Sequence, residues 1–348
     1  MDAVPGCRAL MSLSTGAEIL DIPDRPRCDL PVRTYNSTPS FIRRFLLAPL
    51  SAPRLRKRVA ALRPDLAICA MPAPLDLLMA TVLRRLRVPV VVVVHDADLH
   101  PGDGSRVQML LQRRLLNQSA VAVALTGHVA ARLREQGLGM PGAGAAAGSV
   151  PRLMRATLPP LSFGVAPTAP LSHGGPLRLL FFGRLLPYKG LDLLAETLAR
   201  DPALGRRLAV RVVGQGPDDP ALAVLARLPA VTVENRWVPE EEIGDLIRWT
   251  DAIVLPYREA SQSGVAAAAI AARRWVVSTR VGGLAEQFRD EQLALLCEPD
   301  PADLGRTLHR LLDAPPPLPP LSVPADEQWR RMARSLMSDL RTALHLPA

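Results

Sequence analysis

The stretch Leu177-Arg-Leu-Leu-Phe-Phe-Gly-Arg-Leu-Leu-Pro-Tyr-Lys-Gly190 decides the fold. Its first half is a short apolar run, which is the pattern of a buried parallel strand. Gly183 interrupts this run, and Leu191, Leu194 and Leu198 then follow at helical spacing. The pattern predicts a strand, a turn and a helix, which together form the repeating unit of a parallel α/β sheet.

Two basic residues, Arg184 and Lys189, lie in the predicted turn. In α/β sheets ligands bind at the carboxyl ends of the strands, and cations beside a helix N-terminus suit a diphosphate. The chain has 42 Lys and Arg residues, of which only Lys57 and Lys189 are lysine. Lysine at position 189 is therefore an unusual choice for this chain. The alternative interpretation is an ordinary solvated loop.

Length and composition favour a soluble protein with two domains. The chain has 348 residues, enough for two cores. The apolar run Val88–Val94 is far shorter than the roughly 20 residues that a membrane-spanning helix needs, and the first residues do not follow the order of a secretory signal. The cysteines lack metal-site spacing, which favours the cytoplasm; they are Cys7, Cys28, Cys69 and Cys297.

The net charge of +9 is unevenly distributed. Residues 1–165 carry 21 basic and 11 acidic side chains, whereas residues 166–348 carry 21 and 22. Residues 41–63 combine apolar and basic side chains at about helical spacing, which favours a peripheral contact with an anionic membrane surface. The alternative is a solvated helix packed on a sheet. Nucleic acid is not expected, because no known module accompanies the arginines.

The N-terminal half lacks a firm opening strand and a Gly-rich turn, and residues 16–22 are the first strand candidate. From residue 64 onward we expect strands at 64–70, 88–94 and 121–125, with helices at 75–86, 110–116 and 129–136. His95 follows a strand at its carboxyl end, where a ligand can bind. A structural histidine bonded to a carbonyl is the alternative there, and His100 and Asp103 are weaker candidates.

Between residues 137 and 176 the periodicity is lost, and the low-complexity run Gly142–Gly148 and several prolines follow. This composition is typical of a linker. We therefore divide the chain into an N-terminal domain (1–165), a C-terminal domain (166–314) and a Pro-rich connector with a final helix (315–348). Strands and helices alternate in both domains, which predicts an α/β protein of two facing, doubly wound Rossmann-like domains.

Four motifs of the C-terminal domain occur in a recognisable order. They are Gly183-Arg184 with Lys189-Gly190, Gly214-Gln-Gly-Pro217, Asp251-Ala-Ile-Val-Leu-Pro-Tyr257 and Arg280-Val-Gly-Gly-Leu-Ala-Glu286. This domain resembles the donor domain of the retaining glycosyltransferases of family 4 (glycosyl transferases group 1), which have the GT-B fold. The resemblance covers residues 177–312 well, and Val88–Asp96 and Val121–Leu133 more loosely resemble the acceptor domain. The final helix is similar to the family's C-terminal helix, which returns to the N-terminal domain.

The resemblance implies transfer of a sugar from a nucleotide-diphospho-sugar to a polysaccharide or glycolipid acceptor. It implies retention of configuration and no metal or other cofactor. His95 and Glu259 would be the catalytic residues. Gln215 and Gly216 would lie near the nucleoside. The diphosphate would be bound by residues of the two turns, namely Gly183, Arg184, Lys189, Ser263, Gly264 and Val265.

The sequence also departs from the family pattern. The family has two glutamates separated by seven residues; Glu259 stands near the first position, but Ala266–Ala269 occupy the region of the second. The turn Ser261–Val265 resembles that of members with a changed second position. A catalytically impaired protein that binds a nucleotide-sugar or a partner enzyme therefore stays open. A nucleotide-sugar epimerase of the same fold is a further alternative, without a supporting acid/base set.

Overall fold

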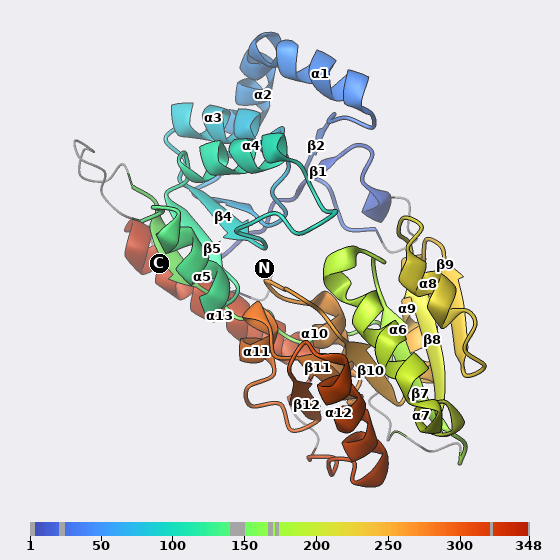
Figure 1. Ribbon diagram of the computed structural model, residues 1–348. Coiled ribbons are helices and arrows are strands. Elements are labelled where there is room, and N and C mark those ends of the chain that lie inside the picture. The colour runs from blue at the N-terminus through green and yellow to red at the C-terminus, as the bar shows by residue number, and fades with distance from the viewer. Residues whose placement is uncertain are drawn as a thin grey trace.

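A computed structural model describes residues 4–20, 25–139, 150–165, 170, 174–320 and 323–346. Two α/β halves, each built on a parallel sheet, lie next to each other (Figure 1). The predicted fold class is confirmed. The predicted linker run Gly142–Gly148 lies outside the described residues.

The C-terminal half contains a six-stranded parallel sheet in the order β12-β11-β10-β7-β8-β9. Its strands are β7 (Leu177–Phe182), β8 (Leu208–Gly214), β9 (Val231–Asn235), β10 (Ala252–Leu255), β11 (Trp275–Thr279) and β12 (Ala294–Cys297). Its helices are α6 (Leu191–Arg200), α7 (Pro202–Arg207), α8 (Pro220–Leu225), α9 (Glu240–Trp249), α10 (Gly264–Ala271), α11 (Gly282–Gln287) and α12 (Pro301–Asp313). The apolar runs form one core between sheet and helices.

The strand order creates a switch point between β7 and β10. The chain runs from β7 outward through β8 to β9, and then returns to β10 on the other side of β7. At such a point the following connections leave the sheet in opposite directions and open a crevice at the carboxyl ends of the strands. The turn after β7 and the turn after β10 therefore flank the natural ligand crevice of this half.

The N-terminal half has a four-stranded parallel sheet in the order β3-β4-β5-β6 and a separate pair, β1-β2. The strands are β1 (Ser12–Ser14), β2 (Leu30–Val32), β3 (Ala67–Cys69), β4 (Val90–Val94), β5 (Val121–Ala124) and β6 (Arg152–Arg155). The helices are α1 (Thr38–Leu46), α2 (Ala48–Leu62), α3 (Asp76–Arg85), α4 (Arg106–Leu116) and α5 (Gly127–Glu135).

Two sequence predictions for this half are wrong. In the described part of the strand expected at residues 16–22, Glu18–Leu20 is a short 3-10 helix, and a strand lies earlier, at Ser12–Ser14. The linker expected from residue 137 to 176 contains β6, which pairs with β5 at the sheet edge. Both strands are short and only partly buried. They therefore lack the apolar run that identifies a central strand.

The final helix, α13 (Ala325–Leu344), returns to the N-terminal half. Leu336, Met337 and Leu340 are buried against valines of β4 and β5, including Val91 and Val123. In Figure 1 this helix runs along the back of the molecule past both halves. The apolar residues of its inner face thus join the last segment of the chain to the first sheet.

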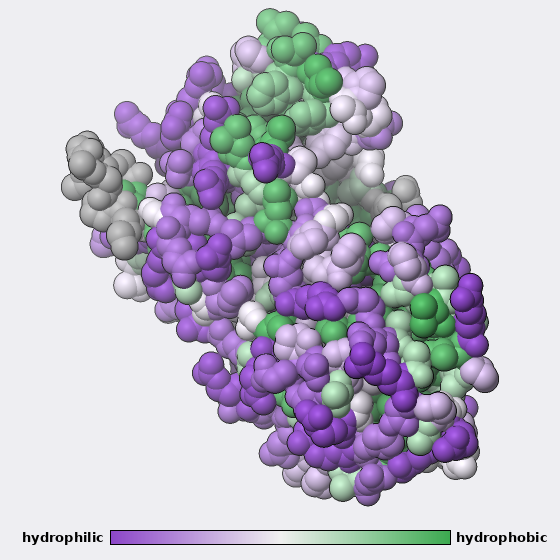
Figure 2. Space-filling view, viewed as in Figure 1, coloured by the Kyte–Doolittle hydropathy of each residue, from purple (hydrophilic) through white to green (hydrophobic). Residues whose placement is uncertain are grey.

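Helices α1 and α2 differ in how they meet the protein. Leu55 and Val59 of α2 are buried in the N-terminal core. No residue of α1 is buried, and Leu46 is 71% exposed. Figure 2 shows apolar side chains gathered at the top of the molecule, where α1 lies. None of the described helices is long and apolar enough to span a bilayer.

Candidate functional site

The turn after β7 is built by close backbone packing. Gly190 has a φ of 70°, and a Cβ there would lie 1.8 Å from the carbonyl oxygen of Pro256. Gly183 has a φ of 125°, and its missing side chain leaves room beside Val265. At position 190 only glycine tolerates both the positive φ and the close approach of the Pro256 carbonyl. The turn after β7 is therefore locked against the end of β10, and Gly183 lies next to the start of α10.

Arg184 points from this turn to the N-terminal half. Its two terminal nitrogens lie 2.7 Å and 2.5 Å from the carboxylate oxygens of Asp103, in a bidentate pair. Asp103 belongs to the loop between β4 and α4. A carboxylate that accepts two parallel hydrogen bonds occupies the arginine in the same way as a phosphate would. An anionic ligand must compete with Asp103 for Arg184.

Lys189 lies over two aromatic rings. Its Nζ is 3.9 Å from the centroid of Tyr257 and 4.8 Å from that of Tyr188. Within the described part of the chain, Lys189 makes no ion pair. The rings position the ammonium group by cation–π attraction, and its charge stays available to an anion.

His95 lies between the two halves. Its Nε2 is 2.7 Å from the carbonyl oxygen of Ala70, and its Nδ1 is 2.8 Å from Nε2 of Gln262. Because a carbonyl only accepts, Nε2 of His95 carries the proton and Nδ1 accepts from the Gln262 amide. Both ring nitrogens are therefore engaged, one with each half of the protein.

His100 also lies between the two halves, and its side chain is only 9% exposed. Nε2 is 3.1 Å from Oδ1 of Asp96 and 3.4 Å from Oγ of Ser261. Nδ1 is buried without a hydrogen-bond partner among the described residues, 3.7 Å from Oε1 of Glu259. The ring stacks on Tyr188 at a centroid distance of 4.6 Å. His100 thus links the N-terminal half to the turns after β7 and β10.

Electrostatics hold the His100 and Asp96 side chains in opposite charge states. Burial by itself lowers the pKa of His100, but the hydrogen bond to Asp96 and the charges of Asp96 and Glu259 outweigh it, so that the pKa is raised above 6.5. Burial raises the pKa of Asp96, but hydrogen bonds from His100 and Ser261 outweigh it and lower the pKa below 3.8. At a pH between 3.8 and 6.5, His100 is therefore protonated and Asp96 is ionised, and the two side chains form an ion pair.

The turn after β10 carries the other predicted donor residues. Ser263 caps α10, since its hydroxyl accepts from the N–H of Ala266, and its own N–H donates to Gln287. Gly264 and Val265 are the first two residues of α10. Their N–H groups lie at the positive end of a helix, which suits an anion.

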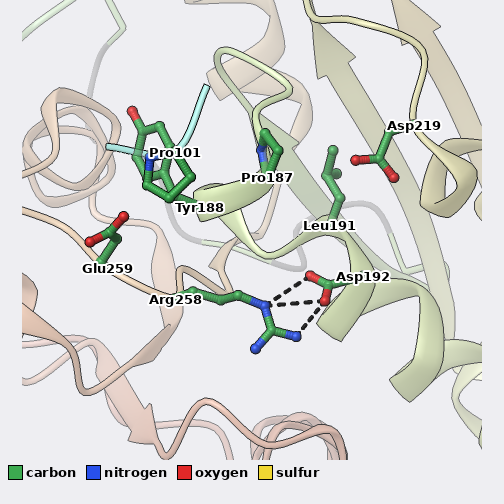
Figure 3. Close-up of a pocket in the computed structure, with 8 residues that line it drawn as sticks. All are labelled: Pro101, Pro187, Tyr188, Leu191, Asp192, Asp219, Arg258 and Glu259. Atoms are coloured by element: carbon green, nitrogen blue, oxygen red, sulfur yellow. Dashed lines mark hydrogen bonds and ion pairs between the residues drawn. The ribbon is translucent and has the colours of Figure 1, made fainter. Parts of the chain in front are cut away.

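A cavity of about 370 Å³ lies beside these turns. Its lining residues are Pro101, Pro187, Tyr188, Leu191, Asp192, Asp219, Arg258 and Glu259. Figure 3 shows Glu259 and Asp219 at opposite ends of the cavity and the ion pair of Arg258 with Asp192 at its floor. Among the predicted site residues, only Glu259 lines this cavity. Pro101 comes from the N-terminal half, so both halves contribute to the wall.

Gln215 and Gly216 lie on the next turn, after β8. The carbonyl of Gln215 accepts from the N–H of Leu185, and Gly216 exchanges two hydrogen bonds with the Asn235 side chain. A Cβ at Gly216 would lie 2.1 Å from the carbonyl oxygen of Leu185. These two residues therefore support the turn that carries Arg184, and neither of them lines the cavity.

The alanine run in α10 is buried. Ala266–Ala269 are all at most 3% exposed, and the carbonyl of Ala267 accepts from the N–H of Leu161. Ala268 packs with Val165 and Ile247. The segment that follows β6 covers this face of α10, so a glutamate there would have to displace it.

Sequence reasoning missed Ser261 and Tyr188 as site residues and underrated His100. Tyr188 and Ser261 lie within predicted turns, and their polarity was the available signal. Their contacts with His100 join residues far apart in the chain, which local patterns do not show. No group of three or more metal-ligating side chains occurs among the described residues.

Comparison with known families identifies two regions of the chain. The family model described as "Glycosyl transferases group 1" matches residues 176–314, and the "Glycosyl transferase 4-like domain" matches residues 15–144. The two matched regions together cover most of the chain, which belongs to the glycosyl transferases with these two domains. Its motif turns at Arg184 and Glu259 fall within the first matched region.

Named relatives cover part of the chain. The D-inositol 3-phosphate glycosyltransferase of Frankia alni is 36% identical over 184 residues, which are 48% of this chain and 45% of that protein. The 2-deoxystreptamine glucosyltransferase of Streptomyces kanamyceticus is 31% identical over 150 residues, 42% of this chain and 38% of that protein. The match spans less than half the length of these curated relatives.

Solved structures share the fold. Anabaena HepE in complex with UDP and glucose has a TM-score of 0.59 and 17% identity, covering 87% of this chain and 80% of that one. Sucrose-phosphate synthase from Thermosynechococcus elongatus has a TM-score of 0.57 and 15% identity, covering 90% and 78%. The fold of this glycosyl transferase is therefore GT-B.

Proposed function

We propose that this glycosyl transferase transfers a sugar from a nucleotide-diphospho-sugar to a polysaccharide or glycolipid acceptor, with retention of configuration. The observation that carries the proposal is the cation pair Arg184 and Lys189 in the turn at the switch point. Two cations on one turn match the charge of a diphosphate. The complexes of Anabaena HepE with UDP and UDP-glucose support a nucleotide-sugar donor.

In the proposed reaction the bond between the anomeric carbon and the diphosphate oxygen breaks, and a bond to an acceptor hydroxyl oxygen forms on the same face. The nucleoside diphosphate leaves and takes up the acceptor proton. Negative charge grows on the leaving group, and Arg184 and Lys189 would stabilise it without a metal or other cofactor. His95 and Glu259 would contact the donor sugar near the reacting carbon.

The test is a panel of UDP-, GDP- and ADP-sugars, with binding and sugar release followed together. A charge-assisted contact contributes about 1.5–3 kcal/mol, so Lys189→Ala should weaken donor binding about ten- to hundredfold. Lys57→Ala, the matched change at the other lysine, should leave binding unchanged. If no nucleotide-sugar binds, or if Lys189→Ala binds like the wild type, the donor-site assignment is wrong.

A second candidate is a catalytically impaired protein that binds a nucleotide-sugar or a partner enzyme. Its support is the alanine run at Ala266–Ala269, where no carboxylate is available to a ribose. Turnover separates the candidates: nucleotide-sugar binding without transfer or release of sugar in the same panel would favour the impaired protein.

The exposed helix α1 supports a peripheral position on the cytoplasmic face of a membrane. Phe45 and Leu46 are exposed together, and Leu50 follows at 72% exposure. Arg43 and Arg44 lie on the same helix. Apolar side chains beside arginines are the composition that binds anionic lipid surfaces.

Vesicle co-sedimentation tests this placement. We expect the protein to bind vesicles that contain about 30% anionic lipid. We expect salt to weaken this binding, because it screens the electrostatic attraction. Leu46→Glu should reduce binding and leave folding stability within about 0.5 kcal/mol, because Leu46 is a surface residue. Binding that is indifferent to lipid charge and salt would rule out the anionic surface.

A further inference from the structure

A second cavity, of about 530 Å³, lies in the wall of the N-terminal half. It is formed where the start of α1 meets the start of α4, two ends that lie close together in Figure 1. Its lining residues are Tyr35, Asn36, Ser37, Thr38, Phe41, Pro74, Ser105, Val107, Gln108 and Leu111. Its size is within the range of cavities that bind small ligands.

One loop connects this cavity to the donor side of the cleft. Pro101 lines the first cavity and Ser105 lines the second. Four residues of extended chain span at most about 14 Å, so the two cavities are near neighbours. In Figure 1 this loop descends from α4 toward α6, which borders the first cavity. A saccharide held in the second cavity would therefore extend along this loop to reach a sugar bound at the turns of the C-terminal half.

The lining of the second cavity has a definite chemistry. None of its residues carries a formal charge at neutral pH, and two of them are aromatic. Tyr35 and Phe41 pack edge to face, with centroids 5.1 Å apart. Hydroxyl and amide groups of the remaining polar residues offer both donors and acceptors. A phosphate would find no cation to pair with among the lining residues.

We propose that this cavity binds the acceptor and that the acceptor is an uncharged, polyhydroxylated saccharide or polyol rather than a sugar phosphate. The inference rests on the proposed function, since it names the substrate class for the second half of that reaction. Sugar hydroxyls would bond to Asn36 and Gln108, and an apolar ring face would pack on Phe41. The acceptor class thus differs from the inositol phosphate in the names of several relatives.

The experiment compares octyl glucoside, galactoside and mannoside with their 6-phosphates, and inositol with inositol 3-phosphate, using whichever nucleotide-sugar binds. We expect transfer to, or binding of, the neutral member of each pair at least tenfold better than the phosphorylated one. Gln108→Leu and Phe41→Ala should raise the acceptor KM at least tenfold and leave donor affinity unchanged. Gln292→Leu, an exposed glutamine outside both cavities, is the matched control.

A gain-of-function variant makes the test independent of folding damage. Val107 lines the cavity and is 60% exposed, so Val107→Arg should place a cation at the rim and improve the phosphorylated acceptors relative to the neutral ones. Preference of the wild type for phosphorylated acceptors, or unchanged acceptor KM in both loss variants, overturns the inference. Failure of every nucleotide-sugar to bind overturns the proposed function instead, and is recognised before any acceptor is added.

Discussion

The two walls of the cleft between the halves are held in different ways. On the donor side, the turn after β7 is fixed by backbone contacts, with Gly190 packed against the carbonyl of Pro256. On the facing side, the loop between β4 and α4 is held by side chains, chiefly His100 and Asp103. A wall fixed by its backbone keeps its geometry, whereas a wall held by side chains exchanges those contacts when a ligand offers better ones.

The largest expected effect tests the backbone-fixed wall. Gly190 and Gly174 have nearly the same φ, 70° and 69°, but a Cβ at Gly174 would have no neighbour within 4 Å. Gly174→Ala should therefore cost about 1 kcal/mol of unfolding free energy through its φ alone. Gly190→Ala adds a clash with rigid backbone and should cost at least about 3 kcal/mol. Urea unfolding of both variants measures the difference. Equal losses of unfolding free energy in the two variants would show that the backbone of the turn after β7 can move to accommodate a Cβ.

A smaller effect tests the side-chain-held wall. Asp103→Asn keeps the size of the side chain but removes the charge that occupies Arg184. An exposed ion pair contributes up to about 1 kcal/mol, so donor affinity should rise up to about fivefold in this variant. Asp313→Asn, which removes the partner of Arg207 on a remote surface, serves as control. Weaker donor binding by Asp103→Asn would mean that Asp103 belongs to the binding site itself.

The smallest effect concerns the pH dependence of the same wall. Because the pKa of His100 is raised in the folded protein, its contribution to stability is complete below pH 6.5 and is lost as pH rises through the raised value. The lowered pKa of Asp96 sets the lower limit, since that contribution is complete above pH 3.8 and is lost as pH falls through the folded value. The contact between the halves should thus weaken on the alkaline side, measured as a fall in melting temperature or a rise in donor KM.

Two substitutions separate the ring nitrogens of His100. His100→Gln places its amide near the Nε2 position and keeps a link to Asp96, whereas His100→Asn places its amide near Nδ1, opposite Glu259. Both should abolish the alkaline step, because neither titrates. His309→Gln makes the same change in a comparable histidine–aspartate pair, with Asp201, away from the cleft, and should leave the alkaline step in place. An alkaline step that persists in both His100 variants would assign it to another group.

The donor half could be largely predicted from the sequence. Its strands are apolar runs bounded by glycine and proline, and the apolar run that is interrupted by Gly183 forms β7 (Leu177–Phe182), as expected. Polar edge strands carry no such pattern, so β1 and β6 escaped prediction. The His100 cluster could not be predicted, because it joins a loop to turns 88 or more residues away, as Ser261 at a separation of 161 illustrates. Only folding brings those side chains together.

The chain crosses between the halves twice, before β7 and before α13. The indole N–H of Trp329, near the start of α13 and just after the second crossing, donates to the carbonyl of Pro160, in the first crossing, at 2.9 Å. This hydrogen bond holds the two crossings side by side. Because the two connections lie side by side, we expect any opening of the halves to be a rotation about these connections rather than a sliding of one half past the other. A cleft that opens in this way returns its facing residues to the same register each time it closes.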